Sequence, residues 1–220
     1  MSRYVSEFLA TFTMLLAILE SILLTAAQGA TVSLVVSAVT AGAAVTILIY
    51  RFGKLSGAHM NPAVSAAVWL DNRLTTRVFF GYVIAQLAGS LAAAGLVDFL
   101  HRDEFYVMGA TVPTLSEGAA WIVEFALTFL LVLLIFRTED ARFPKLQKFA
   151  PVYIGLLVAI MIIIAGPYSG ASFNPARSFG PAVMESQTEY HWLFFSAPLV
   201  GAAAGRYFDL LFRKKQPATA

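Results

Sequence analysis

The chain contains one short motif twice, as Ser56-Gly57-Ala58-His59-Met60-Asn61-Pro62-Ala63-Val64 and as Ser169-Gly170-Ala171-Ser172-Phe173-Asn174-Pro175-Ala176-Arg177. In each copy a polar, glycine-containing segment leads into Asn-Pro-Ala. Asparagine is a favoured N-cap and proline suits the first helical position, so each copy predicts the start of a helix. The two helices should be short, over 62–70 and 175–184, and about 14–15 Å long. Placed end to end, they would cross a hydrocarbon layer roughly 30 Å thick.

The composition indicates a membrane protein. Of the 220 residues, 59% are hydrophobic and 13% are charged, and the mean hydropathy is +0.74. A soluble domain is roughly 45–50% apolar and about 25% charged, so one soluble core of this size could not bury the excess. The absence of cysteine excludes disulfides and thiolate metal sites. The net charge of +2 gives no indication of a nucleic-acid partner.

Six apolar runs are long enough to span a bilayer. They cover residues 5–26, 32–50, 77–97, 119–136, 150–166 and 191–211. One copy of the motif follows the second run and the other follows the fifth. The halves also share a second pattern, Glu7-Phe8-Leu9-Ala10-Thr11-Phe12 and Glu124-Phe125-Ala126-Leu127-Thr128-Phe129. We therefore expect one domain, residues 1–220, built from repeats over 1–98 and 118–212.

Each repeat has three spans, so the second repeat must enter the membrane from the opposite side. If the N-terminus is cytoplasmic, all of the 15 Lys and Arg except Arg102 and Arg177 fall on the cytoplasmic side. This bias predicts cytoplasmic N- and C-termini. Inverted repeats are typical of transport proteins, in which broken helices meet near the midplane. The connection 98–118 is expected to be a solvated loop, and the tail after Lys215 a disordered segment.

The segments before the two short helices have chemistry suited to a pore. Non-helical backbone at membrane depth must be buried in protein or line a wet cavity, so its carbonyls should form a ladder of acceptors. The residues expected in this ladder are Gly57, Ala58, His59, Gly170 and Ser172. At the centre, Asn61 and Asn174 can each offer an amide donor. The two helix N-termini, each worth roughly half a positive charge, would repel cations there while neutral hydroxylated molecules pass.

These features resemble the aquaporin (major intrinsic protein) family along essentially the whole chain, and the double Asn-Pro-Ala signature is highly specific. The resemblance implies an all-α membrane protein with six tilted transmembrane helices and two re-entrant half-helices. It also implies a homotetramer in the lipid bilayer, with one pore per subunit and no cofactor or metal. Glu7 and Glu124 would accept hydrogen bonds from the re-entrant loops, with a proton relay as the alternative. Ser178, where glycerol facilitators carry Asp, is of the water-channel or nodulin-like type.

Spacing from the two motifs assigns the family's narrow constriction to Ala41, Ile162, Ala171 and Arg177. Water channels usually have Phe and His at the first two positions, and glycerol facilitators have Trp and a second aromatic residue. Ala41 and Ile162 predict a wider, more apolar throat, while Arg177 supplies a fixed cation with several donors. This set resembles those of nodulin-like proteins that pass boric acid and of bacterial metalloid channels. Further apolar pore wall is expected at Met14, Leu131 and Val158.

The sequence thus predicts a passive channel for small uncharged solutes, namely arsenous and boric acid, glycerol and urea, and for water, with ions and protons excluded. A strict water channel, an ion-coupled secondary transporter and a structural junctional membrane protein are the alternatives. An enzyme is not expected, because no nucleophile–base or metal-ligand spacing occurs. Glu20 could face the outer vestibule or a neighbouring subunit. Short terminal extensions favour a prokaryotic inner (plasma) membrane.

Overall fold

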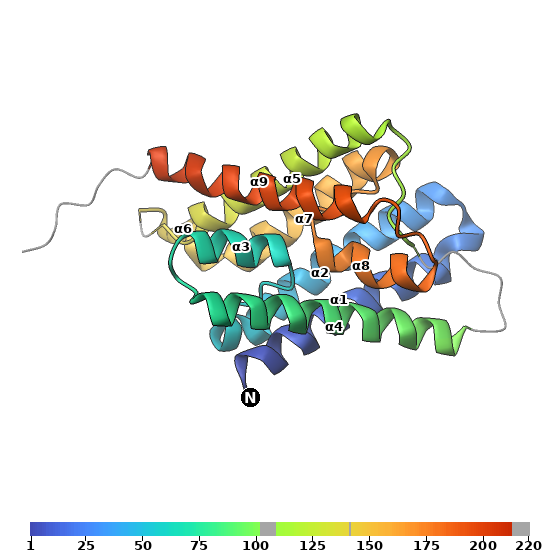
Figure 1. The fold of residues 1–220 in the computed structure, drawn as a ribbon, viewed down its shortest axis with the longest axis horizontal. Helices are drawn as coiled ribbons and strands as arrows, with labels where there is room; N and C mark the ends of the chain where they lie inside the picture. Colours follow the sequence, from blue (N-terminus) through green and yellow to red (C-terminus); the bar gives the residue numbers. More distant parts are fainter. Residues whose placement is uncertain (102–108, 141, 213–220) are drawn as a thin grey trace, which may run out of the picture.

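The computed structural model describes residues 1–101, 109–140 and 142–212, and its regular elements there are all helical (Figure 1). The six long helices are α1 (Arg3–Thr25), α2 (Ala30–Ser56), α4 (Thr76–Leu100), α5 (Glu117–Thr138), α7 (Ala150–Ser169) and α9 (His191–Phe212). The shorter elements are a 3-10 turn (Ala26–Gln28), α3 (Pro62–Leu70), α6 (Pro144–Lys148) and α8 (Pro175–Met184).

Each of the six apolar runs forms a long helix. By length and hydropathy alone, five of the described helices could cross a membrane, namely α1, α2, α4, α5 and α7. The sixth, α9, has 22 residues like α5, but Arg206 and Asp209 lower its hydropathy. These two residues are 3% and 0% exposed, so they face protein. The predicted class, an all-α membrane protein with six spans and two half-helices, is confirmed.

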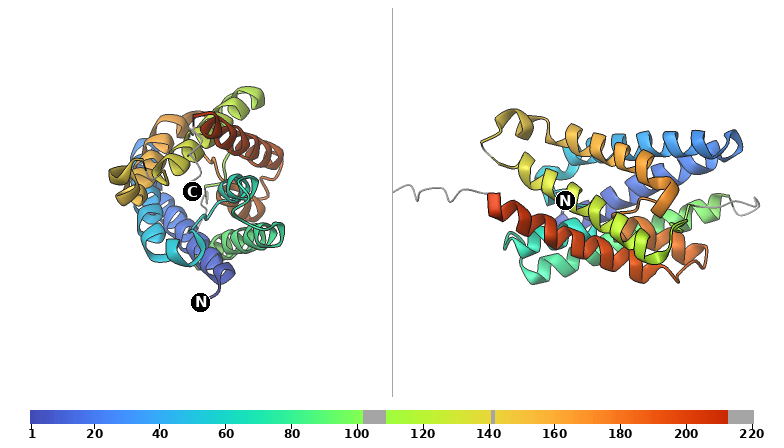
Figure 2. Two further views of the ribbon diagram at one scale, coloured as in Figure 1. Left: turned by 90° about the vertical axis from the view of Figure 1, so that its left-hand side faces the viewer. Right: turned by 90° about the horizontal axis from the view of Figure 1, so that it is seen from above.

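The long helices pack side by side, and the two short helices lie between them. The closest packing is of α5 with α9, of α1 with both α4 and α2, and of α2 with α7 (Figure 2). Glycine permits this closeness, since a Cβ on Gly42 of α2 would lie 2.5 Å from the carbonyl oxygen of Gly155 on α7. In Figure 1, α3 and α8 lie one after the other along the bundle, with their N-terminal ends meeting in the middle.

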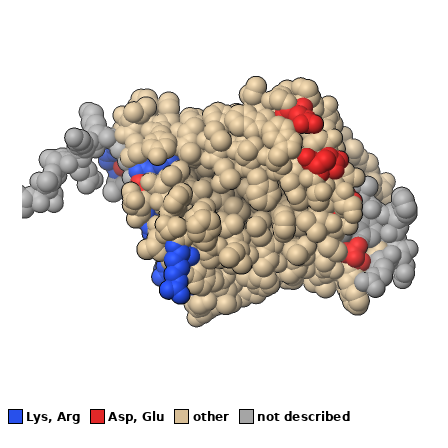
Figure 3. All heavy atoms as spheres, in the orientation of Figure 1, with Lys and Arg blue, Asp and Glu red and all other residues tan. Residues whose placement is uncertain are grey.

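Charge is distributed unevenly along the bundle. On the face drawn in Figure 3, Lys and Arg gather toward the end where Figure 1 places α6, and most Asp and Glu lie toward the other end. The N-terminal residue and the end of α9 are also at the α6 end (Figure 1). Of the segments expected to be solvated or disordered, residues 102–108 of the long connection and the tail after Lys215 lie outside the described residues.

Candidate functional site

The backbone before each short helix is strained in the same way in both halves. A glycine ends the preceding helix in the left-handed region, Gly57 with φ 95° and Gly170 with φ 86°. Residues with side chains then also take positive φ values, which are 49° and 50° at Ala58 and Met60 and 43° and 38° at Ala171 and Phe173. Each such residue costs on the order of 1–3 kcal/mol unless its surroundings hold it. The holding groups are two buried carboxylates.

Glu7 of α1 holds the first loop. Its Oε1 accepts hydrogen bonds from the Ser56 hydroxyl at 2.6 Å and the His59 N–H at 3.0 Å. Its Oε2 accepts from the Met60 N–H and from Gln86 Nε2, both at 2.8 Å. The side chain of Glu7 is fully buried, and all four groups are donors, so an ionised carboxylate matches them.

Glu124 of α5 makes the corresponding contacts in the second half. Oε1 accepts from the Ser169 hydroxyl at 2.7 Å and the Ser172 N–H at 3.0 Å. Oε2 accepts from the Phe173 N–H at 2.5 Å. Each half of the chain therefore carries a glutamate on its first helix that fixes its own re-entrant loop. Both act from behind the loops and not from within the cavity described below.

Asn61 and Asn174 join the two halves at the centre. Each side-chain oxygen caps its own short helix, by accepting from the N–H of Ala63 at 2.8 Å or of Ala176 at 2.9 Å. Each side-chain nitrogen donates across to the other loop. Asn61 Nδ2 bonds the Phe173 carbonyl and Asn174 Nδ2 bonds the Met60 carbonyl, both at 2.9 Å.

These hydrogen bonds between the loops reduce the number of amide N–H donors that are available to a solute. The sequence suggested that each NH₂ group is available to a passing oxygen. In the structure one N–H of each is committed to the opposite loop, and an amide has two. One donor per asparagine therefore remains for a solute. The carbonyls of Met60 and Phe173 were missed by sequence reasoning, although each stands directly before its asparagine.

A cavity of about 230 Å³ runs past both loops and both asparagines. The residues predicted for the constriction all line it, namely Ala41, Ile162, Ala171 and Arg177. The predicted ladder residues line it too, namely Gly57, Ala58, His59, Gly170 and Ser172. So do the predicted wall residues Met14, Leu131 and Val158. The structure thus gathers these positions around one space.

Arg177 is held by a segment in which the sequence predicted only a solvated loop. Its NH1 donates to the Gly109 carbonyl at 2.7 Å. Nearby, the Thr111 hydroxyl donates to Ser178 Oγ at 2.6 Å, and Ser178 Oγ lies 2.5 Å from Ser172 Oγ. Thr111 is 3% exposed, so the expectation of a solvated loop is wrong here. The reason is that a partly buried guanidinium needs an acceptor, which this backbone supplies.

The end of the cavity away from Arg177, called its second mouth below, lies at the C-terminal end of α5. Thr138, Glu139 and Ala150 line it there, and Glu139 forms an ion pair with Arg73. Sequence reasoning did not predict a carboxylate in the cavity wall. Glu20, whose role the sequence left open, pairs instead with His101 at 3.2 Å when that ring is protonated.

Comparison with known proteins agrees with this geometry. The family model described as Major intrinsic protein matches residues 1–208. Aquaporin NIP3-1 of Arabidopsis thaliana is 37% identical over 219 residues, which cover 96% of this chain and 67% of that protein. Nodulin-26 of Glycine max is 38% identical, over 77% of this chain and 62% of its own length. The chain therefore spans about two thirds of the length of these relatives.

A solved structure shares the fold. The X-ray structure of the aquaglyceroporin from Plasmodium falciparum superposes with a TM-score of 0.83 over 94% of this chain and 93% of that one, at 24% identity. At that identity the match concerns the fold alone. The family model, the nodulin-like plant relatives and the shared fold together identify the chain as a member of the major intrinsic protein (aquaporin) family, a multi-pass membrane channel and not an enzyme.

Proposed function

We propose that this chain is a passive channel for small uncharged solutes, namely arsenous acid, boric acid, glycerol and urea, and for water. The observation that carries the proposal is that Ala41, Ile162 and Arg177 line the same cavity. Alanine leaves space where a large ring would close the throat, and isoleucine presents no polar group. Arg177 supplies several donors in a fixed fork. A solute broader than water can therefore bond Arg177 and the Ala171 carbonyl on one side and contact apolar wall on the other.

Exclusion of ions and protons follows from the same centre. The N-termini of α3 and α8 meet there, and each carries roughly half a positive charge, so a cation is repelled. Asn61 and Asn174 are fixed by their cross-bonds. Water at the centre must accept from these fixed donors, which breaks a continuous proton wire. Neither effect opposes the passage of a neutral molecule.

We also propose a homotetramer in the lipid bilayer, with one pore in each subunit and both termini cytoplasmic. The gathering of Lys and Arg toward the α6 end supports this orientation (Figure 3). Residues 1–98 and 118–212 would be inverted repeats of one channel domain, 1–220, and the matched contacts of Glu7 and Glu124 support that division. The relatives compared are plant proteins and give no support to a prokaryotic inner membrane, which stays a prediction from the sequence.

Proteoliposome uptake distinguishes these readings. Stopped-flow traces for water, glycerol, boric acid and arsenous acid would be compared, each with and without a proton gradient. The proposal expects uptake of all four that does not saturate and does not depend on the gradient. Water uptake alone would indicate the strict water channel. Saturable, gradient-driven uptake would indicate a secondary transporter, and no uptake would leave the junctional protein.

A further inference from the structure

At the end of the cavity opposite Arg177, the lining residue Glu139 forms an ion pair with Arg73, which lies outside the lining set. This pair has no role in the proposed function so far. Among the described lining residues, Arg177 is the one arginine and Glu139 the one acidic residue. Arg177 follows the second Asn-Pro-Ala motif, whereas Glu139 is the C-cap residue of α5. The cavity therefore has a guanidinium toward one end and a carboxylate at the other.

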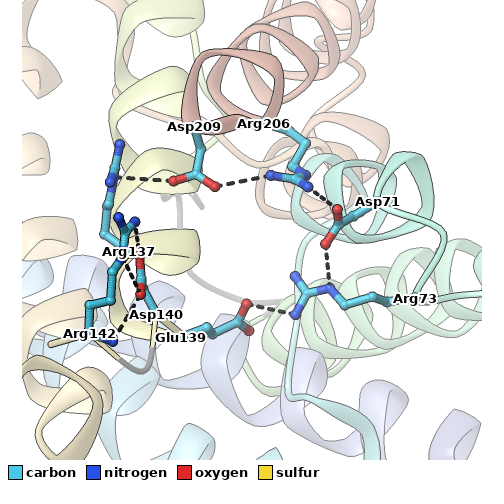
Figure 4. Close-up of polar contacts among 8 residues, drawn as sticks. All are labelled: Asp71, Arg73, Arg137, Glu139, Asp140, Arg142, Arg206 and Asp209. Carbon is cyan, nitrogen blue, oxygen red and sulfur yellow. Dashed lines mark hydrogen bonds and ion pairs between the residues drawn. The ribbon is translucent and has the colours of Figure 1, made fainter. Parts of the chain in front are cut away.

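Glu139 is held in place by Arg73 (Figure 4). Arg73 NH1 lies 2.7 Å from Glu139 Oε2, and Arg73 Nε lies 2.8 Å from Asp71 Oδ2. The Arg73 guanidinium also stacks 4.7 Å from the centre of the Phe136 ring, which is fully buried. Two ion pairs and a ring contact therefore fix the group that orients the carboxylate.

Further ion pairs connect Arg73 to buried charged residues. Asp71 also pairs with Arg206, and Arg206 NH1 lies 3.0 Å from Asp209 Oδ2 (Figure 4). Asp209 Oδ1 in turn lies 3.1 Å from Arg137 Nε. The side chains of Arg206 and Asp209 are 4% and 0% exposed, whereas those of Arg73 and Glu139 are 40% and 43% exposed. The series of ion pairs thus extends from buried residues to the solvent-exposed pair Arg73 and Glu139.

The exposed pair Arg73 and Glu139 suits a neutral molecule that has both hydrogen-bond donors and hydrogen-bond acceptors. A carboxylate only accepts and a guanidinium only donates, and each has capacity beyond their single shared bond. A polyol, boric acid or urea can donate to Glu139 and accept from Arg73 at once. Beside the first-loop residues Gly57, Ala58 and His59, the cavity lining also contains apolar side chains, at Val45, Val68 and Ile135.

We propose that Glu139 and Arg73 form a second solute-binding subsite, at the mouth opposite Arg177, for small neutral molecules that both donate and accept hydrogen bonds. The subsite rests on the proposed function and deepens it. A solute that leaves the first loop finds both a donor and an acceptor there before it enters bulk water. A water molecule does not need to bond both groups at once, because it is small enough to bond Glu139 or Arg73 alone.

Two variants at one position test this subsite. Glu139→Leu removes the acceptor, and Glu139→Gln keeps an acceptor oxygen without the charge. Glu117→Gln is the matched control, because Glu117 is an exposed carboxylate in the first turn of α5, outside the set that lines the cavity. Glycerol, boric acid and water permeabilities would be measured in proteoliposomes with equal amounts of reconstituted protein.

We expect Glu139→Leu to lower glycerol and boric acid permeability about three- to tenfold, the loss of one partly exposed charged hydrogen bond, with water permeability within about twofold of wild type. Glu139→Gln should fall between, and Glu117→Gln should match wild type. Equal losses of water and glycerol in both Glu139 variants, or no loss in either, would overturn the subsite alone. A wild-type chain that carries none of the neutral solutes would overturn the proposed function, and the subsite with it.

Discussion

Replacing Glu124 with glutamine perturbs the second loop with almost no change in size. The carboxylate accepts from Ser169, Ser172 and Phe173, and an amide has one oxygen where the carboxylate has two. If the amide oxygen stays with Ser169 and Ser172, the NH₂ group faces the Phe173 N–H, donor against donor. The orphaned N–H costs about 1–3 kcal/mol, and weakening the charged bonds to the other two costs roughly 1 kcal/mol more.

The total, about 2–4 kcal/mol, is a large part of the roughly 5–15 kcal/mol by which a domain is stable. It corresponds to a fall in melting temperature of roughly 4–16 °C for a chain of this size. The effect should also reach the pore, because Phe173 is the residue whose carbonyl Asn61 bonds. We therefore expect lower solute permeability even at temperatures where the variant is folded.

Thermal unfolding in detergent and stopped-flow uptake on the same preparations would measure both effects. Glu117→Gln makes the same chemical change on the same helix, at an exposed position in its first turn. The reasoning is refuted if Glu124→Gln unfolds at the same temperature as this control and carries glycerol at the wild-type rate.

Three other substitutions have definite expected outcomes. Ala41→Phe should place a ring in the throat and lower glycerol and boric acid uptake at least about tenfold, with water uptake retained; stopped-flow uptake that leaves the ratio unchanged would contradict the assigned constriction. Asp209→Leu should leave the buried Arg206 short of a partner and cost about 3–5 kcal/mol, seen as an early melting transition. Thr111→Val should remove the buried bond to Ser178 and lower stability by about 1–2 kcal/mol. The same melting assay would compare it with Thr114→Val, which removes exposed hydrogen bonds to the Pro167 and Tyr168 carbonyls and should cost less.

Local chemistry made much of the fold predictable. The two Asn-Pro pairs placed the starts of α3 and α8 correctly, because N-caps act within one turn. The run predicted over 32–50 was too short, since α2 continues through Arg51 and Lys54 to Ser56. Charge marks where a helix leaves the apolar layer and does not by itself end the helix. Helix ends at the membrane surface were therefore the least well predicted part of the fold.

The family resemblance implied the contacts of Glu7 and Glu124 with the loops, but other contacts between distant segments could not be predicted. The acceptor for Arg177 is the carbonyl of Gly109. Every residue has a backbone carbonyl, so the residue type at this position does not reveal the contact. The carboxylate in the second mouth is also a tertiary effect, since Glu139 and Arg73 come from different helix ends. Ala41 and Ile162 could be predicted because the family resemblance implies their spacing from the motifs, and both line the cavity. No comparable rule applies to pairs of surface charges.

The reciprocal bonds between Asn61 and the second loop, and between Asn174 and the first, have a consequence for biosynthesis. A nascent chain that has emerged only through α4 contains one asparagine whose acceptor has not yet been translated. The middle of the conduit can therefore mature only after synthesis passes Phe173, so assembly of the pore is necessarily a late event. It follows that the two halves, produced as separate polypeptides in one cell, should find each other through the same reciprocal contacts and complete a pore that neither could build alone.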